Sequence, residues 1–226
     1  MKIVLKIGGS ILYSGDKINR PLVMEYVEMI NKLQERGVSL AVVVGGGRAA
    51  RDFIGAADYL NVNKSLQDWL GIEAARQNAR LFCTAFSHAY PTPPTSYEEL
   101  MAALMKFNLV FVGGLQPGQS TNAVAAVVAE TMRADYIFNL TDVEYVYDKD
   151  PDQFSDAKKL EEISYSKFYA IISQNEQNPG TYALFDVVAA QVIGRSNIKL
   201  HFVNGRKPEN TLAVLDGKKV GTVVHG

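Results

Sequence analysis

The chain has 226 residues, with 23 Lys or Arg against 24 Asp or Glu, and a formal net charge of −1. This balance argues against a protein that coats nucleic acid or an anionic membrane surface. The only cysteine, Cys83, excludes a disulfide within the chain and a cysteine-rich metal site, and its apolar neighbours predict buried filler inside a helix. The chain shows no secretory signal and no apolar run of membrane-spanning length, so we expect a cytoplasmic protein.

Apolar runs and amphipathic stretches alternate along the chain. Strands are predicted at 3–7, 40–44, 109–112, 136–140 and 199–203, and helices at 21–34, 49–59, 65–86, 97–106, 123–132 and 182–195. Gly37 follows the first helix in the position of a C-cap. This order predicts a doubly wound α/β fold, with helices on both faces of a mostly parallel sheet.

The segment from Val42 to Arg51 is the most informative part of the sequence. An apolar strand is followed by Gly45-Gly46-Gly47, and then by the start of a helix that carries Arg51 one turn in. Glycines let the backbone approach a ligand, and a helix N-terminus offers free N–H groups to an anion. The segment therefore indicates a phosphate-binding corner. The alternative is that these glycines only end a strand, because neither a dinucleotide fingerprint nor a P-loop is present.

Four polar or glycine-rich loops follow predicted strands. They are Gly8–Ser10, Gly45–Gly47, Gly113–Thr121 and Thr141–Asp150. In a parallel sheet such loops gather beyond one edge, where nucleotides bind. Ordinary turns explain any one loop but explain the set poorly. Lys6 lies at the end of the first strand, where it is either a solvated lysine or a charge for a phosphoryl group in transit.

Two of these loops carry further groups. Gln116, Gln119, Ser120 and Thr121 offer hydrogen bonds to a nucleobase, although Ser120 or Thr121 equally suits a helix cap. Tyr147 offers an aromatic face to adenine. The three histidines show no spacing typical of a zinc site.

Taken in order, these segments resemble the amino acid kinase superfamily and, within it, the uridylate kinases of archaeal type. The resemblance covers essentially the whole chain. It implies a three-layer αβα sandwich forming a single domain, with an acceptor-binding lobe at about 1–140 and an ATP-binding lobe at about 141–226. It also implies ATP-dependent phosphorylation of UMP to UDP with Mg²⁺, and a homohexamer in which the 65–86 helix supplies a subunit contact.

The resemblance assigns roles to individual residues. Lys6 would stabilise the transferring phosphoryl group, Asp186 would orient the lysine and the metal region, and Arg51 would join them in catalysis. ATP would contact Gly9, Ser10, Gly47, Arg51, Thr141, Asp142, Tyr147 and Asp150. UMP would contact Gly46, Asp68, Leu115, Gln116, Pro117, Gly118, Gln119, Ser120 and Thr121. No residue is expected to bind the metal directly, because ATP phosphates would hold most of its ligand positions.

The reaction that the resemblance implies does not require a general base in the site. An acceptor phosphate is largely ionised at neutral pH, so transfer to it needs positioning, positive charge and Mg²⁺ rather than a general base. Two positions depart from the family pattern. Glu144-Tyr145 replaces Asp-Gly, and Asn122 stands where an aspartate is common.

Alternatives within the fold remain open. An isopentenyl phosphate kinase would show a histidine in place of Val44, and an acetylglutamate kinase would lack the Gln116–Gln119 segment. A non-catalytic nucleotide-binding or storage protein is the third possibility. The presence of Lys6, Arg51, Asp68 and Asp186 favours an enzyme instead.

Overall fold

The computed structural model describes residues 1–151, 153–176 and 185–226. The strands are β1 (Lys2–Ile7), β2 (Tyr13–Ser14), β3 (Lys17–Ile18), β4 (Ser39–Val44), β5 (Leu109–Val112), β6 (Tyr136–Thr141), β7 (Val146–Tyr147), β8 (Lys159–Leu160), β9 (Glu162–Ser164), β10 (Lys199–Asn204) and β11 (Thr222–His225). The helices are α1 (Arg20–Glu35), α2 (Gly47–Tyr59), α3 (Lys64–Cys83), α4 (Tyr97–Lys106), α5 (Thr121–Met132), α6 (Tyr165–Glu176), α7 (Val187–Arg195) and α8 (Glu209–Leu215), with a 3₁₀ turn at Gly9–Leu12.

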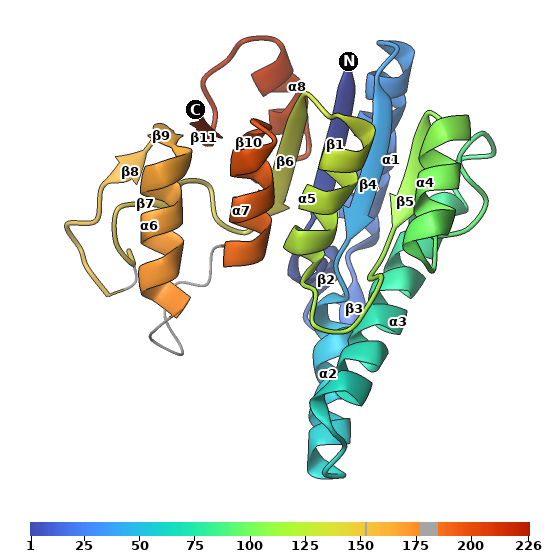
Figure 1. Cartoon of the computed structure of the whole chain (residues 1–226). Coiled ribbons are helices and arrows are strands. Elements are labelled where there is room, and N and C mark those ends of the chain that lie inside the picture. Colours follow the sequence, from blue (N-terminus) through green and yellow to red (C-terminus); the bar gives the residue numbers. More distant parts are fainter. Residues whose placement is uncertain (152, 177–184) are drawn as a thin grey trace.

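The central sheet has the order β5-β4-β1-β6-β10-β11-β9 (Figure 1). The first five strands in that order are parallel, while β11 runs antiparallel to β10 and parallel to β9. The chain builds the sheet outward from β1 through β4 to β5, and then returns to place β6 on the other side of β1. The switch in strand order therefore lies between β1 and β6.

Helices cover both faces of the sheet and confirm the predicted three-layer sandwich. On one face, α4, α5, α6 and α7 pack over alternate strand residues such as Val4, Ile137 and Phe202. On the other face, α1, α3 and α8 pack over Ile3, Leu5 and Phe138. Because β1, β4 and β5 are buried on both sides, they form the continuous apolar runs that parallel strands require.

The five predicted strands are present, with ends that differ by a residue or less, and α4 has the predicted bounds. Arg36 is the C-cap of α1, and Gly37 follows it with φ +71 and donates its N–H to the Gln34 carbonyl, so the prediction that this glycine ends the helix is confirmed. The prediction of a helix to residue 86 is wrong. After Cys83 the chain turns and buries Phe86 against Phe111, with ring centroids 5.4 Å apart. Cys83 is buried, but it ends α3 instead of lying inside it.

The predicted start of the last long helix is also wrong within the described residues. The Asp186 side chain accepts the Ala189 N–H at 2.8 Å, so Asp186 is the N-cap and α7 begins at Val187. Residues 182–184 of that prediction lie outside the described part of the chain.

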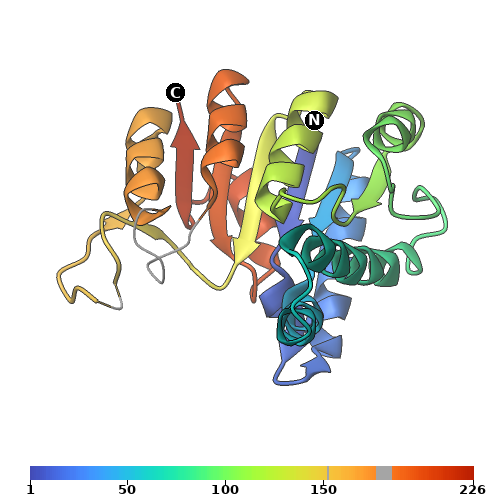
Figure 2. The same ribbon diagram turned by 60° about the horizontal axis from the view of Figure 1, so that its bottom comes forward.

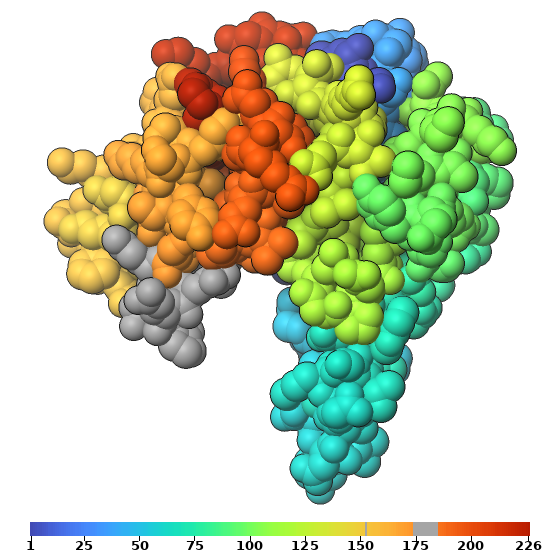
Figure 3. Space-filling view, viewed as in Figure 1, coloured from blue at the N-terminus to red at the C-terminus, as the bar shows by residue number. Residues whose placement is uncertain are grey.

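Helices α2 and α3 lie side by side and project beyond the carboxyl edge of the sheet (Figures 1 and 2). We call α2 and the first half of α3 the arm. Large apolar side chains of the arm are exposed, namely Phe53, Tyr59, Leu60, Leu66 and Trp69. The space-filling view shows the surface hollowed between the arm and the C-terminal half (Figure 3). Over the residues described, no helix combines the length and apolar character needed to cross a membrane.

Candidate active site

The four predicted loops meet at one edge of the sheet. They follow β1, β4, β5 and β6, whose carboxyl ends point the same way (Figure 1). Backbone hydrogen bonds join the loops: Gly45 N–H donates to the Ile7 carbonyl at 3.0 Å, and Gly8 N–H donates to the Leu140 carbonyl at 2.8 Å. This edge includes the switch point between β1 and β6, where ligands bind in open α/β sheets.

Lys6 lies on β1 at this switch point, between Val43 of β4 and Asn139 of β6. Burial removes water from its ammonium group and lowers the pKa of Lys6 to about 8. The carboxylates of Asp142 and Asp186 act in the opposite direction and favour the charged form. The structure thus brings together Lys6 and Asp186, two of the three predicted catalytic residues, with Asp142 beside them.

The glycine loops after β1 and β4 pack backbone against backbone. A β-carbon on Gly9 would lie 2.2 Å from the Gly47 nitrogen, and one on Gly47, whose φ is +61, would lie 2.3 Å from the Gly9 oxygen. Neither position has room for a side chain. The packing of the two loops therefore requires glycine at both positions, whether or not a phosphate binds there. The two glycines keep the loops in one fixed arrangement.

Asn78 of α3 fixes the loop after β4 by hydrogen bonds to its backbone. Its Nδ2 donates to the carbonyls of Gly45 at 2.8 Å and Gly46 at 3.2 Å, and its Oδ1 accepts the Tyr13 hydroxyl at 3.1 Å. Asn78 was not among the predicted site residues. It lies in the polar run Arg76-Gln77-Asn78, so only the fold shows that its side chain is buried on α3.

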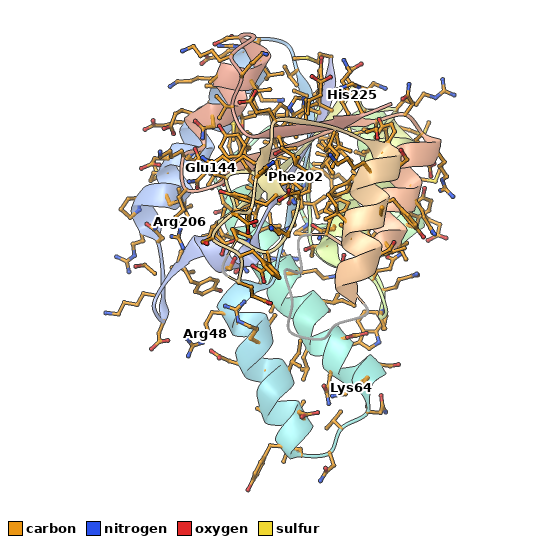
Figure 4. All side chains as sticks on the ribbon, turned by 90° about the vertical axis from the view of Figure 1, so that its left-hand side faces the viewer. Arg48, Lys64, Glu144, Phe202, Arg206 and His225 are labelled. Atoms are coloured by element: carbon orange, nitrogen blue, oxygen red, sulfur yellow. The ribbon has the colours of Figure 1, made fainter. Side chains whose placement is uncertain are left out.

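Helix α2 begins directly at the glycine loop. Its N-cap, Gly46, offers no side chain to the first N–H groups, so these remain available to an anion. Arg51 is exposed and forms no hydrogen bond or ion pair with any described residue. Arg48, at the root of the arm (Figure 4), is instead held by Asp52 at 2.7 Å and Asp16 at 3.0 Å. Within the described part of the chain, Arg51 is therefore the cation of this turn that has no partner.

The loop between β5 and α5 is fastened to α3. Asp68 accepts the Gly118 N–H at 2.8 Å, and Arg76 donates to the carbonyls of Gly114 at 3.0 Å and Leu115 at 3.4 Å. The Leu115 side chain is buried in the core, so this residue presents only its backbone. Arg76 is a second residue that the sequence analysis missed, since an arginine on an amphipathic helix ordinarily suggests a solvated face.

Ser120 connects the two halves of the site. Its hydroxyl oxygen accepts the N–H groups of Asn122 and Ala123 at 3.0 Å, which confirms the alternative that it caps α5. The same hydroxyl donates to Asp186 Oδ2 at 2.5 Å. The caps of α5 and α7 therefore share one hydrogen bond.

The remaining predicted acceptor residues lie on the same loop. Gln116 and Gln119 line a cavity with Thr95, Tyr97 and Val127, on the side of the loop that faces α4. Pro117 and Thr121 are half-buried, and so is Ser10 in the turn after β1.

The segment after β6 starts at the site and then leaves it. The Thr141 hydroxyl donates to Asp142 Oδ1 at 3.0 Å, and the Thr141 carbonyl accepts the Gly205 N–H at 2.7 Å. Tyr147 lies farther along, in the β7–β8 hairpin, and Asp150 accepts from Gln153 in the turn beyond it. Glu144-Tyr145 is the pair that departs from the family pattern. The Lys159 ammonium lies 4.6 Å from the centre of the Tyr145 ring, so the Tyr145 side chain packs against the β7–β8 hairpin.

Metal-ligating groups are sparse in the described part of the chain. No three His, Cys, Asp or Glu side chains gather there as a metal site would require. His225 pairs with Glu162 at 2.5 Å on β11 and β9, at the end of the sheet opposite Arg48 (Figure 4). The site offers the carboxylates of Asp142 and Asp186. This donor set suits Mg²⁺, which is commonly bound by one or two carboxylates together with water and substrate phosphates.

Known proteins share both the sequence and the architecture. A model of the amino acid kinase family matches residues 1–204. The uridylate kinase of Methanothermobacter thermautotrophicus is 41% identical over 225 residues, which is 99% of each protein, and that of Hyperthermus butylicus is 44% identical over 206 residues, or 91% of each. The crystal structure of uridylate kinase from Archaeoglobus fulgidus superposes with a TM-score of 0.88 at 34% identity, covering 99% of this chain and all of that one. On these matches, the chain belongs to the amino acid kinase family and, within it, to the uridylate kinases.

Proposed function

We propose that this chain transfers the terminal phosphoryl group of ATP to UMP, giving ADP and UDP for pyrimidine nucleotide synthesis. The bond between the γ-phosphorus and the bridging oxygen of ATP breaks as a UMP phosphate oxygen bonds to that phosphorus. The observation that carries the proposal is the half-buried Lys6 beside Asp142 and Asp186 at the switch point, in a chain that matches uridylate kinases over nearly its full length.

Lys6 would act by charge. Phosphoryl transfer spreads negative charge over the equatorial oxygens of the transferring group, and a desolvated ammonium stabilises that charge more strongly than a solvated one does. The UMP phosphate is already ionised and needs no base. Asp186 would keep Lys6 charged and in place, in agreement with its effect on the Lys6 pKa.

The glycine loops would hold the donor. Backbone N–H groups of Gly9, Gly47 and the first turn of α2 suit phosphate oxygens, and Arg51, which has no partner among the described residues, adds a positive charge on that turn. Ser10, Thr141, Asp142, Tyr147 and Asp150 complete the proposed ATP contacts. Mg²⁺ would neutralise charge on the donor phosphates, and Asp142 and Asp186 are the carboxylates of the described residues that act on Lys6 there.

The β5–α5 loop would hold the acceptor. Gly46, Asp68 and the segment from Leu115 to Thr121 are the proposed UMP contacts. Asp68 and Arg76 fix this segment before any ligand binds, which reduces the entropy lost when UMP binds.

A coupled assay for ADP release tests the proposal. Purified protein with Mg·ATP is offered UMP, CMP, dUMP, AMP, acetylglutamate and isopentenyl phosphate. We expect turnover with UMP at least about tenfold above every other acceptor, which corresponds to roughly 1.4 kcal/mol of discrimination in the transition state. Lys6→Ala should reduce kcat by about a thousandfold, in the range seen when a group that stabilises transition-state charge is removed.

Other outcomes would correct specific parts of the proposal. Turnover with a different acceptor would keep the phosphate loops and overturn the assignment of Leu115 to Thr121. Tight ATP binding without turnover of any acceptor would favour a storage protein. Full activity in Lys6→Ala would remove Lys6 from the mechanism.

We further propose that the protein assembles as a homohexamer through contacts that include α3. The exposed apolar residues of the arm support an interface with a second copy of the chain, since a large exposed apolar patch is unfavourable in water. The residues lie mainly on α2 and the first half of α3, next to the acceptor loop.

A further inference from the structure

Asn139 stands out among the buried polar residues. It lies in β6, between Phe138 and Leu140, and its side chain is only 1% exposed. Its Oδ1 has no hydrogen-bond partner among the described residues. A buried amide oxygen without a partner costs stability, and such groups are rare enough that each requires an explanation.

The neighbours of Asn139 limit what that explanation can be. The register of the sheet places Lys6 of β1 on one side and Phe202 of β10 on the other. Residues in register on parallel strands share one face of the sheet, and Phe202 is fully buried and apolar. Lys6 is therefore the in-register neighbour that can donate a hydrogen bond.

We propose that Asn139 is a positioning residue for Lys6, whose ammonium group donates one hydrogen bond to Asn139 Oδ1 and thereby stays aimed at the transferring phosphoryl group. This inference rests on the proposed function. The long lysine side chain reaches the oxygen by rotation about its own bonds, and contacts of this kind tighten when substrate binds. An ammonium has three donors, so two remain for phosphate oxygens.

A neutral acceptor suits this position because the charges around Lys6 are already set. Asp142 and Asp186 are the carboxylates that act on it. Val43 on β4 and the first α5 residues, Thr121, Asn122 and Ala123, contribute no titratable group. A third carboxylate would bind the ammonium tightly and compete with the phosphate, whereas an amide oxygen orients it without a charge.

The test replaces Asn139 by leucine, which has a similar volume and no polar atom. Removal of an unpaired buried amide should leave the protein at least as stable, so the midpoint temperature of thermal unfolding should not fall. We expect kcat to drop by about tenfold with KM for ATP and UMP changed by less than about twofold, as for an interaction made only in the transition state. Asn139→Asp should move the alkaline limb of kcat/KM to higher pH.

Thr211→Val provides the matched control. Thr211 on α8 is fully buried and its Oγ1 also has no partner among the described residues, but it belongs to no part of the proposed site. We expect this variant to keep the wild-type kcat. Equal losses in both variants would indicate a general packing effect and overturn the proposal.

A direct titration separates this proposal from the proposed function. ¹⁵N NMR follows the Lys6 Nζ signal with pH, assigned by its loss in Lys6→Arg. In Asn139→Leu the group should lose its proton at a lower pH than in the wild type. A shift in a protein that does not phosphorylate UMP would keep the positioning role and reject the acceptor. An unchanged titration together with an unchanged kcat would overturn the inference.

Discussion

Lys6 is half-buried, and the loss of water around its ammonium group lowers its pKa to about 8. Because an unfolded lysine binds its proton up to a pKa near 10.5, the folded state binds fewer protons between about pH 8 and 10.5. The destabilising effect of this residue is therefore complete below about pH 8 and declines as the pH rises toward 10.5. The protein retains a residue that weakens its fold, as is typical of a functional site.

The same pKa predicts how activity depends on pH. Only the protonated ammonium stabilises the transferring phosphoryl group, so kcat/KM should fall as the pH rises through about 8. The limb in kcat should lie at higher pH, because bound phosphates favour the charged form. Steady-state rates from pH 6 to 10 measure both limbs. Lys6→Arg, which stays charged throughout, should lose the limb; a limb that persists in this variant would contradict the assignment.

The sequence identified some residues of the candidate site and missed others. Lys6 was identified because it precedes a glycine loop, and Asp186 because the family resemblance marks it. Asn139 was missed although it is a lone amide between Phe138 and Leu140, and Asn78 was missed because it follows Gln77 in a polar run. Local periodicity gives such a residue no role, and only the register of the sheet or the fold of α3 shows what lies beside it.

At the scale of elements, the two glycine loops act as one unit. Their backbones touch across Gly9 and Gly47, and Asn78 holds the Gly45 and Gly46 carbonyls. Phosphate-binding N–H groups supplied by such a unit keep their spacing before the ligand arrives. This preorganisation is the main contribution that elements, as distinct from single side chains, make to the site.

A pair of glycine substitutions tests this packing. Gly9→Ala places a β-carbon against backbone atoms that cannot move aside, and we expect a loss of about 3 kcal/mol in the free energy of unfolding. Gly55→Ala, inside α2 with open space around it, should gain about 0.5–1 kcal/mol. Urea unfolding of both variants measures the difference. A neutral Gly9→Ala would show that the loops are loosely packed.

The sequence predicted long elements well and short ones poorly. Buried strands such as β1 and β4 and amphipathic helices such as α1 carry their own periodicity. The two- and three-residue strands β2, β3, β7, β8 and β9 have too few residues for a pattern, and they form because a partner strand is present. The helix α6 and the short helix α8 also went unpredicted, as did the strand β11 between β10 and β9.

At the scale of the whole molecule, the arm makes the structure asymmetric. Tyr59 is 88% exposed and Leu60 72% exposed near its tip, while the sheet behind it is fully packed. The family resemblance predicted an interface on the longer of these helices, but the sequence could not show that α2 packs along its first half. That the two helices project together is a consequence of the packing between them.

The fluorescence of Trp69, the only tryptophan in the sequence, tests the proposed homohexamer. Trp69 lies on α3 and is 41% exposed in a single chain. If copies pack through the arm, light scattering should give six times 24.8 kDa, and Trp69 should emit at shorter wavelength than a solvated tryptophan. Leu66→Glu should lower the mass and shift the emission to longer wavelength, whereas Met24→Glu on α1 should change neither. A mass of one chain in the wild type would contradict the assembly.

The continuous pairing of β1 with β4 on one side and β6 on the other has a mechanical consequence. Strand β6 ends the proposed acceptor-binding lobe and pairs in turn with β10 of the proposed ATP-binding lobe, so no hinge can open between the lobes without breaking the centre of the sheet. Enclosure of two nucleotides must therefore come from elements outside the sheet, such as the arm and the loops at the carboxyl edge. The strand that carries Lys6 stays fixed, and the substrates are brought to it.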